Sequence, residues 1–215
     1  MHRSSSAYRT PPACRRVLLA LLVAVVGCKG DGPADPPPSL VDLHSSFESG
    51  LDGWTVAATD TLVGGAGIPW HVQPSTALAY EGSHALELYM ANYTDAAKIW
   101  IVRRIDVPPS RPYHVAISYA LGTRDYGTMN LFALIAGAMT TEPHTREELA
   151  ATYQRDATSN GAASDVGYRW VQKATGVDVT ADASGQLYVV VGVWGTFEVD
   201  RTYYIDALRV RVTPR

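Results

Sequence analysis

The sequence says most about the chemistry of one reactive group, a cysteine thiol at the end of a short apolar run. Cys28 follows Gly27 and the apolar run Val17–Val26, and Arg15 and Arg16 precede that run. A basic segment, a short apolar stretch and a small residue form the layout of a secretory signal peptide. We therefore expect the protein to be exported and the segment before Cys28 to be removed.

The residues around this thiol, Val25-Val26-Gly27-Cys28, resemble the lipobox of bacterial lipoproteins. The resemblance implies cleavage of residues 1–27, a diacylglycerol on the sulfur of Cys28 as the new N-terminus, and the lipid bilayer as a partner. Lys29 stands where an Asp signals inner-membrane retention in enteric bacteria, so we expect a cell-envelope location at the outer membrane. Two alternatives stay open: a transmembrane helix, which needs about twenty apolar residues, and an ordinary signal peptide in which Cys28 is incidental.

Aromatic side chains are the second group that could do chemistry, because a sugar lays its C–H face on a ring while its hydroxyls meet polar groups. The candidate ligand-binding residues are Trp70, Tyr89, Trp100, Arg124, Asp125, Tyr126 and Trp194. Tyr126, in a Gly-bounded turn, is the best exposed candidate. Core packing is the favoured alternative for Trp100 and Trp194, and we expect Trp54 and Trp170 in the core.

Motifs of the common hydrolases are missing from the sequence. It contains no Gly-x-Ser-x-Gly elbow and no His-Glu-x-x-His pair, and Gly64–Gly67 lacks the Lys and helix of a phosphate-binding loop. A glycosidase needs two facing carboxylates about 5–10 Å apart, and distant strands could still supply them. We expect a non-catalytic protein, with a polysaccharide-active enzyme as the remaining alternative.

Charge and cysteine content narrow the possible classes of protein further. Cleavage would remove four of the 18 basic residues and none of the 21 acidic ones, which leaves a net charge of −7. A nucleic-acid partner is therefore not expected. Cys14 would leave with the signal peptide, so the folded part holds no disulfide and must be stabilised by core burial or by a metal ion.

The rest of the chain predicts a tether and one domain. Residues 28–39 are rich in Gly, Pro and charge, with nothing to bury, and predict a disordered tether. Residues 40–215 alternate with period two in short runs broken by turn residues, which indicates an all-β antiparallel sandwich. The clearest expected strands are Leu86–Met90, Lys98–Ile105, Tyr113–Leu121, Leu187–Trp194 and Tyr203–Val212.

One segment breaks the strand pattern. Thr145 and Glu148 fit a capping box, and Leu149 and Tyr153 lie four residues apart. The sequence predicts a short helix over Arg146–Arg155, followed by a mobile loop at residues 159–164. This insertion within residues 138–168 is interpreted as a plain connector, with a functional loop as the alternative.

Three sequence segments resemble those of the galactose-binding-like jelly rolls, the fold of many carbohydrate-binding modules. They are Phe47–Trp54, Glu81–Leu88 and Tyr203–Val210, in that order along the chain. The resemblance implies a jelly-roll β-sandwich and says little about the ligand, because this fold hosts many functions.

The same resemblance implies a structural calcium ion held by Glu48, Asp206 and backbone carbonyls around Ser83. Calcium prefers six to eight oxygen ligands of these kinds. The alternative is that Glu48 and Asp206 bond to turn N–H groups.

Together these features predict a membrane-anchored lipoprotein with a carbohydrate-binding domain. Its rival is an envelope lipoprotein with a structural or protein-interaction role and no exposed ring pair.

Overall fold

The structure is a computed structural model that describes residues 40–91, 95–124, 133–154, 167–195 and 200–215. All of them belong to the unit Pro37–Arg215. The predicted signal peptide, Cys28, the tether, Asp125, Tyr126 and the loop at residues 159–164 lie outside the described residues.

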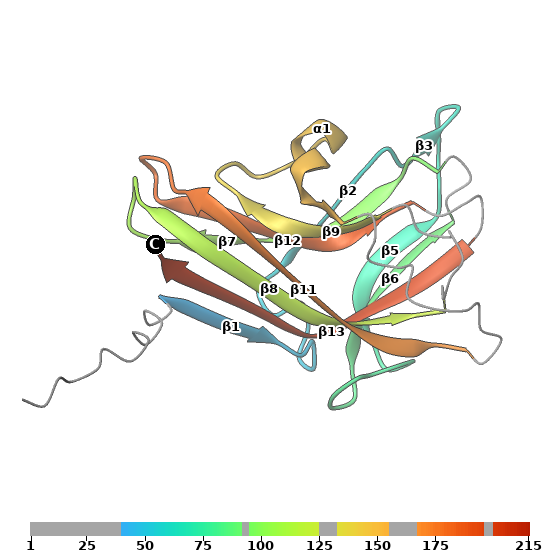
Figure 1. Ribbon diagram of the computed structural model, residues 1–215. Coiled ribbons are helices and arrows are strands. Elements are labelled where there is room, and N and C mark those ends of the chain that lie inside the picture. The colour runs from blue at the N-terminus through green and yellow to red at the C-terminus, as the bar shows by residue number, and fades with distance from the viewer. Residues whose placement is uncertain (1–39, 92–94, 125–132, 155–166, 196–199) are drawn as a thin grey trace, which may run out of the picture. The chain divides into compact units, whose positions relative to one another are not determined.

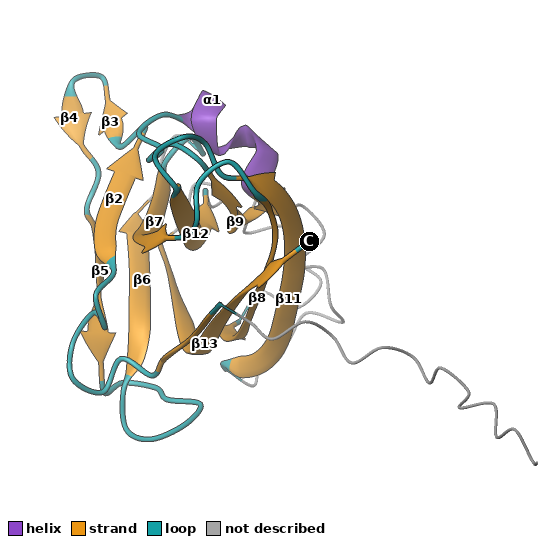
Figure 2. Ribbon diagram, turned by 90° about the vertical axis from the view of Figure 1, so that its left-hand side faces the viewer, coloured by secondary structure: helices purple, strands orange, loops and turns teal. Residues whose placement is uncertain are grey.

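Two antiparallel sheets face each other, as Figures 1 and 2 show. In the first sheet the order is β11 (Arg169–Thr180), β8 (Pro112–Thr123), β13 (Asp200–Pro214), β6 (Ala85–Ala91) and β5 (Trp70–Ser75), with β1 (Val41–Ser45) also on β13. In the second sheet the order is β10 (Tyr153–Gln154), β9 (Ala133–Met139), β12 (Gln186–Trp194), β7 (Lys98–Asp106) and β2 (Thr55–Thr59). A small ribbon joins β3 (Leu62–Val63) to β4 (Ala66–Gly67).

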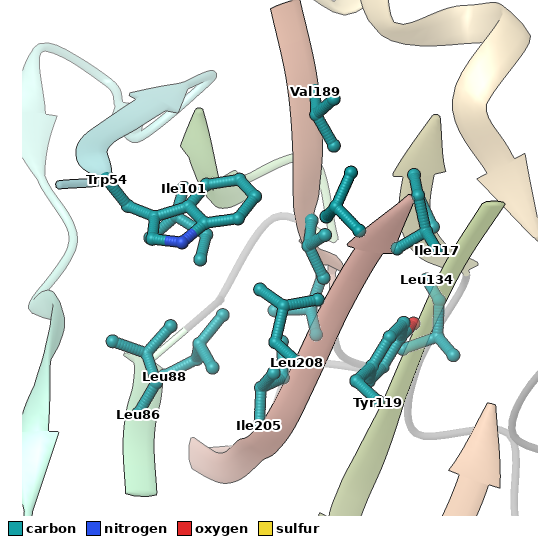
Figure 3. Close-up of a cluster of buried hydrophobic side chains, with 14 of the residues drawn as sticks. Trp54, Leu86, Leu88, Ile101, Ile117, Tyr119, Leu134, Val189, Ile205 and Leu208 are labelled. Carbon is teal, nitrogen blue, oxygen red and sulfur yellow. The ribbon is translucent and has the colours of Figure 1, made fainter. Parts of the chain in front are cut away.

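The core lies between the two sheets and follows the period-two pattern of the sequence. Alternate residues such as Leu86 and Leu88 on β6, and Tyr203 and Ile205 on β13, are fully buried. Figure 3 shows these strands supplying one cluster together with Trp54, which sequence analysis placed in the core. The all-β jelly-roll sandwich is therefore confirmed.

Strand β13 has two neighbours in succession along one edge. It pairs with β6 over Asp200–Ile205 and with β1 over Leu208–Val212. Between these stretches the register with β8 shifts at Asp206, and Ala207 has a positive φ of 50°. This β-bulge turns the Asp206 carboxylate toward the loop that precedes β6.

The inserted segment forms a helix shorter than the sequence predicts. Helix α1 covers Arg146–Leu149 and a 3₁₀ turn covers Ala150–Thr152. The capping box between Thr145 and Glu148 is confirmed. The expected continuation to Arg155 is wrong at Tyr153, because β10 starts there and pairs with β9.

A second apolar cluster lies on the outer face of the second sheet, under this insertion. Leu149 of α1 packs with residues that point away from the main core, namely Trp100, Val102, Ile135 and Val190. The insertion thus covers this sheet face.

An acid-sensitive ion pair fastens β1 to β13. Asp42 accepts hydrogen bonds from Arg209 Nε at 2.8 Å and Nη2 at 2.7 Å, and from Arg211 Nε at 3.2 Å. The bonds from Arg209, reinforced by the charges of both arginines, lower the pKa of Asp42 from 3.8 to about 2.

This ion pair predicts a pH effect on stability. The unfolded state binds a proton on Asp42 more readily than the folded state. The contribution of the ion pair to the free energy of unfolding is therefore complete above about pH 4 and disappears as the pH falls towards 2. We expect Asp42→Asn to flatten the fall of Tm between pH 4 and pH 2 relative to the unchanged protein. Thermal unfolding across this pH series checks it, and parallel curves would contradict it.

Candidate functional site

One row of residues crosses all five main strands of the first sheet on its outer face. Trp170 of β11 lies opposite Gly122 of β8, which lies opposite Tyr204 of β13. Tyr204 in turn lies opposite Glu87 of β6, and Glu87 opposite Gln73 of β5. Their positions alternate with the buried core residues of the same strands, so all five face away from the core.

Aromatic rings cluster along this row. Tyr80, from the loop before β6, meets Trp170 edge-on with ring centroids 5.6 Å apart and planes at 66°. Tyr168 also meets Tyr204 edge-on, with ring centroids 5.3 Å apart and planes at 79°. We call the set Tyr80, Glu87, Tyr168, Trp170 and Tyr204 the aromatic face. Tyr80 is 48% exposed, so at least one ring is open to a ligand.

Gly122 lets the rings approach each other in the middle of the row. A Cβ at this position would lie 3.1 Å from Trp170 Cζ3 and 3.1 Å from Tyr204 Cβ. That separation is tighter than ordinary van der Waals contact, so a side chain at Gly122 would push the two rings apart.

The polar centre of the aromatic face is Glu87. Tyr204 donates its hydroxyl to Glu87 Oε2 at 3.1 Å, and His71 Nε2 donates to Oε1 at 2.8 Å. Burial opposes ionisation of Glu87, but hydrogen bonds from His71, Ser75 and Tyr204 outweigh it and lower its pKa. Burial, followed by the nearby charge of Glu87, raises the pKa of Tyr204. The site therefore presents a fixed carboxylate and a neutral phenol.

Two of the residues predicted to bind a ligand lie at this face. Tyr89 of β6 stacks on His71, with ring centroids 5.1 Å apart and planes at 26°. Arg124 follows β8 and lies over the ring of Tyr168 at 5.7 Å. Both lie two residues along the chain from a member of the row, Tyr89 after Glu87 and Arg124 after Gly122, and they extend the aromatic face on the same side of it.

The structure separates the other candidates from this face. Trp70 of β5 packs against the main core, and Trp100 is fully buried under the insertion, so the alternative of core packing holds for Trp100. Trp170 corrects the expectation of a core residue. It is half-buried on the outer face, because its partner is Gly122 and not an inward-facing residue.

Trp194 belongs to the contacts that fasten the insertion. Its ring packs against that of Tyr153 in a tilted arrangement, with centroids 4.8 Å apart and planes at 37°. The ring also lies 4.8 Å from Lys98 Nζ, which pairs with Asp60 at 2.9 Å. Its Nε1 donates to Asp95 O at 3.3 Å. These partners hold the ring in place, so the aromatic face on the other sheet is the better candidate site.

Sequence analysis did not select Tyr80, Glu87, Tyr168 or Tyr204. A signal for two of them was present, because the positions between the core residues Leu86 and Leu88, and between Tyr203 and Ile205, must point to the opposite face. Tyr80 and Tyr168 lie in loops, where no periodicity marks them.

The residues implied as calcium ligands do come together. Asp206 Oδ2 accepts from the backbone N–H groups of Tyr80 and Glu81 at 2.8 and 3.0 Å. Glu48 Oε1 accepts from the backbone N–H groups of Ser83 and His84 at 2.7 and 3.0 Å. These bonds match the alternative of turn N–H groups that the sequence left open.

A calcium ion fits this arrangement poorly. Glu48 Oε2 also accepts, from Ser83 Oγ at 2.7 Å and His84 Nδ1 at 3.0 Å. Donors therefore occupy the lone pairs that an oxygen ligand must offer to the cation. Among the described residues, no group of three or more His, Cys, Asp or Glu side chains has the geometry to hold a metal. The calcium site stays a prediction, which chelation tests below.

Comparison with known proteins yields structural likenesses. No protein-family model matches the chain. No curated protein matches it. The K2 cleaved adhesin domain of Lys-gingipain covers 79% of this chain and 97% of its own length, at 17% identity and a TM-score of 0.48.

Carbohydrate-binding modules are also among the structural neighbours. The CBM22-1 xylan-binding domain from Paenibacillus barcinonensis Xyn10C covers 84% of this chain and 97% of its own length, at 18% identity and a TM-score of 0.44. TmCBM61 in complex with beta-1,4-galactotriose covers 79% and 94%, at 12% identity and a TM-score of 0.39. At these identities the likeness concerns the fold, an antiparallel β-sandwich.

Proposed function

We propose that this domain binds a glycan, without catalysis, on its aromatic face. The observation that carries the proposal is the row that places Trp170, Tyr204 and Glu87 side by side across the sheet, with Tyr80 exposed beside Trp170. Sugar rings stack their C–H faces on such rings, while the Glu87 carboxylate accepts hydrogen bonds from hydroxyls and the Gln73 amide accepts or donates them.

The carboxylate content of this row favours binding of a glycan over its hydrolysis. Glu87 is its one carboxylate, and hydrogen bonds from His71, Ser75 and Tyr204 already hold it. Hydrolysis of a glycosidic bond needs a pair of carboxyl groups on opposite sides of the substrate. The exposed ring of Tyr80 against the half-buried ring of Trp170 also favours sugar binding over the rival, an interaction protein without an exposed ring pair.

We further propose that diacylglycerol on Cys28 holds the protein at the cell envelope, on the outer membrane. The support is the signal-peptide layout of residues 15–28 and the Lys at position 29. Within the described ranges, no helix has both the length and the apolar character that a membrane span requires. Anchoring and sugar binding together describe a lipoprotein that attaches a glycan to the cell surface or to the periplasmic side of the membrane.

A glycan array probed with the whole chain tests the binding proposal. We expect Tyr80→Ala and Trp170→Ala each to weaken binding about fivefold, the equivalent of about 1 kcal/mol of stacking per ring. Tyr188→Ala is the matched control, because Tyr188 lies on β12 of the other sheet and donates to Gln186.

Two results would refute this proposal. One is the absence of binding to every glycan on the array. The other is equal affinity of Tyr80→Ala, Trp170→Ala and Tyr188→Ala, which would move any bound glycan away from the aromatic face and leave the interaction protein as the better explanation.

A further inference from the structure

We propose that Glu48 and Asp206 position Tyr80 by clamping residues 80–84 directly, so that the aromatic face is built without a bound cation. This inference rests on the proposed glycan site, since it concerns the loop that carries its most exposed ring. The clamp consists of the two carboxylates, one from the turn after β1 and one from β13, and of the backbone N–H groups of the loop between them.

The Asp206 half of the clamp is buried, and both of its oxygens accept hydrogen bonds. Its side chain is 0% exposed. Oδ2 accepts from Tyr80 N and Glu81 N, and Oδ1 accepts from Ala207 N at 2.7 Å. A buried carboxylate must be compensated, and here the three N–H dipoles compensate it, where a cation would otherwise be needed.

The Glu48 half fits against a position where a side chain has no room. A Cβ on Gly82 would lie 2.1 Å from Glu48 Oε1, and Gly82 has a positive φ of 62°. Glycine allows both the backbone conformation and the close approach of the carboxylate. Four donors from Ser83 and His84 then surround Glu48, and they hold its pKa at about 2, chiefly through the backbone bonds of these two residues.

Backbone strain lies directly beside both carboxylates. Phe47, the residue before Glu48, has a φ of 59°, and Ala207, the residue after Asp206, has a φ of 50°. Left-handed backbone is unfavourable for a residue with a side chain, because its Cβ crowds the neighbouring carbonyl oxygen. The hydrogen bonds between the carboxylates and the loop offset this strain. A clamp that works without a cation requires such compensation.

A third acidic residue of the region supplies a matched control. Glu81 lies in the clamped loop, but its side chain points to His44, with Oε1 3.0 Å from Nε2, and is 40% exposed. Glu81→Gln removes one negative charge, as Glu48→Gln does, and leaves the clamp intact. Ser83→Ala removes one bond to Glu48 and keeps the two backbone bonds.

The first experiment measures calcium dependence of the whole chain by thermal unfolding, in calcium chloride and in EGTA. We expect the same Tm in both to within about 1 °C. A Tm that falls in EGTA and recovers with added calcium would overturn the inference. This measurement needs no glycan, so it is decided whether or not the proposed function holds.

The second experiment measures whether the clamp positions Tyr80. Iodide quenching of tryptophan fluorescence is recorded for each variant with and without Trp170→Phe, and the difference reports the exposure of Trp170. We expect Glu48→Gln to raise this difference about twofold, because Tyr80 no longer shields Trp170, and Ser83→Ala to raise it less. Glu81→Gln should leave it unchanged.

Equal quenching in Glu48→Gln and Glu81→Gln would show that Glu48 has no positioning role. If Glu48→Gln does not fold, Ser83→Ala against Glu81→Gln decides the matter in the same way. Raised quenching in Glu48→Gln, together with no glycan binding by the unchanged protein, would count against the proposed function and leave the clamp standing.

Discussion

Cys28→Ser is expected to move the protein from the membrane fraction to the aqueous fraction. Each CH₂ of an acyl chain buried in a bilayer contributes about 0.8 kcal/mol, so one chain gives marginal binding and two chains give stable anchoring. A diacylglycerol on the Cys28 thiol would supply both chains, and serine provides no sulfur to receive them. The loss should be nearly complete.

Fractionation and mass spectrometry of the same samples check this result. The unchanged protein should begin at residue 28 and carry the added acyl mass. Cys14→Ser is the matched control, because Cys14 belongs to the segment that cleavage removes. An unacylated protein that keeps residues 1–27, or identical fractionation of both variants, would exclude the lipid anchor.

Asp206→Ala is expected to cause the largest loss of stability of any single change to the site. Its fully buried carboxylate accepts from three backbone N–H groups, which alanine would leave without an acceptor. Each unsatisfied buried donor costs about 1–3 kcal/mol. We expect the free energy of unfolding to fall by roughly 4 kcal/mol, a large share of the total for a domain of this size.

Urea unfolding of the whole chain in EGTA measures this loss. Asp178→Ala is the control, because Asp178 is exposed and pairs with His114 at 2.7 Å and with Arg215 at the surface. Exposed ion pairs contribute about 1 kcal/mol or less. Similar losses in the two variants would mean that the bonds of Asp206 do not stabilise the fold.

Alternation along single strands was enough to predict the sandwich. Leu86 and Leu88, or Tyr203 and Ile205, repeat with period two, and a sheet with one covered face requires this pattern. The capping box at Thr145 likewise placed the start of α1 correctly, because it depends on residues that are close in sequence.

Burial on the outer faces could not be predicted in the same way. Trp100 points away from the main core, and it is buried because Leu149, far along the chain, folds over it. Trp170 has an apolar ring but a glycine opposite, so it stays half-exposed. A periodic pattern distinguishes the two faces of a strand, but it does not reveal which later segment covers the outer one.

The candidate site was predicted in part for a related reason. Tyr89 and Arg124 were selected from their own surroundings and lie at the aromatic face. Two of the three N–H groups that bind Asp206 lie more than a hundred residues earlier, in the loop of Tyr80. Sequence resemblance indicated that Asp206 and residues near Ser83 meet, and only the folded backbone shows that N–H groups face the carboxylate.

The short strand β1 has a mechanical consequence for a protein tethered through its N-terminus. The chain enters the domain at Leu40, where Val41 lies opposite Val212, and β1 runs towards the end of β13 that carries Tyr204. A pull between a membrane anchor and a glycan held near Tyr204 would act along these strands. Their hydrogen bonds lie perpendicular to that direction. All five residue pairs of β1 and β13 would therefore bear the force at the same time, in shear, and would not break one after another.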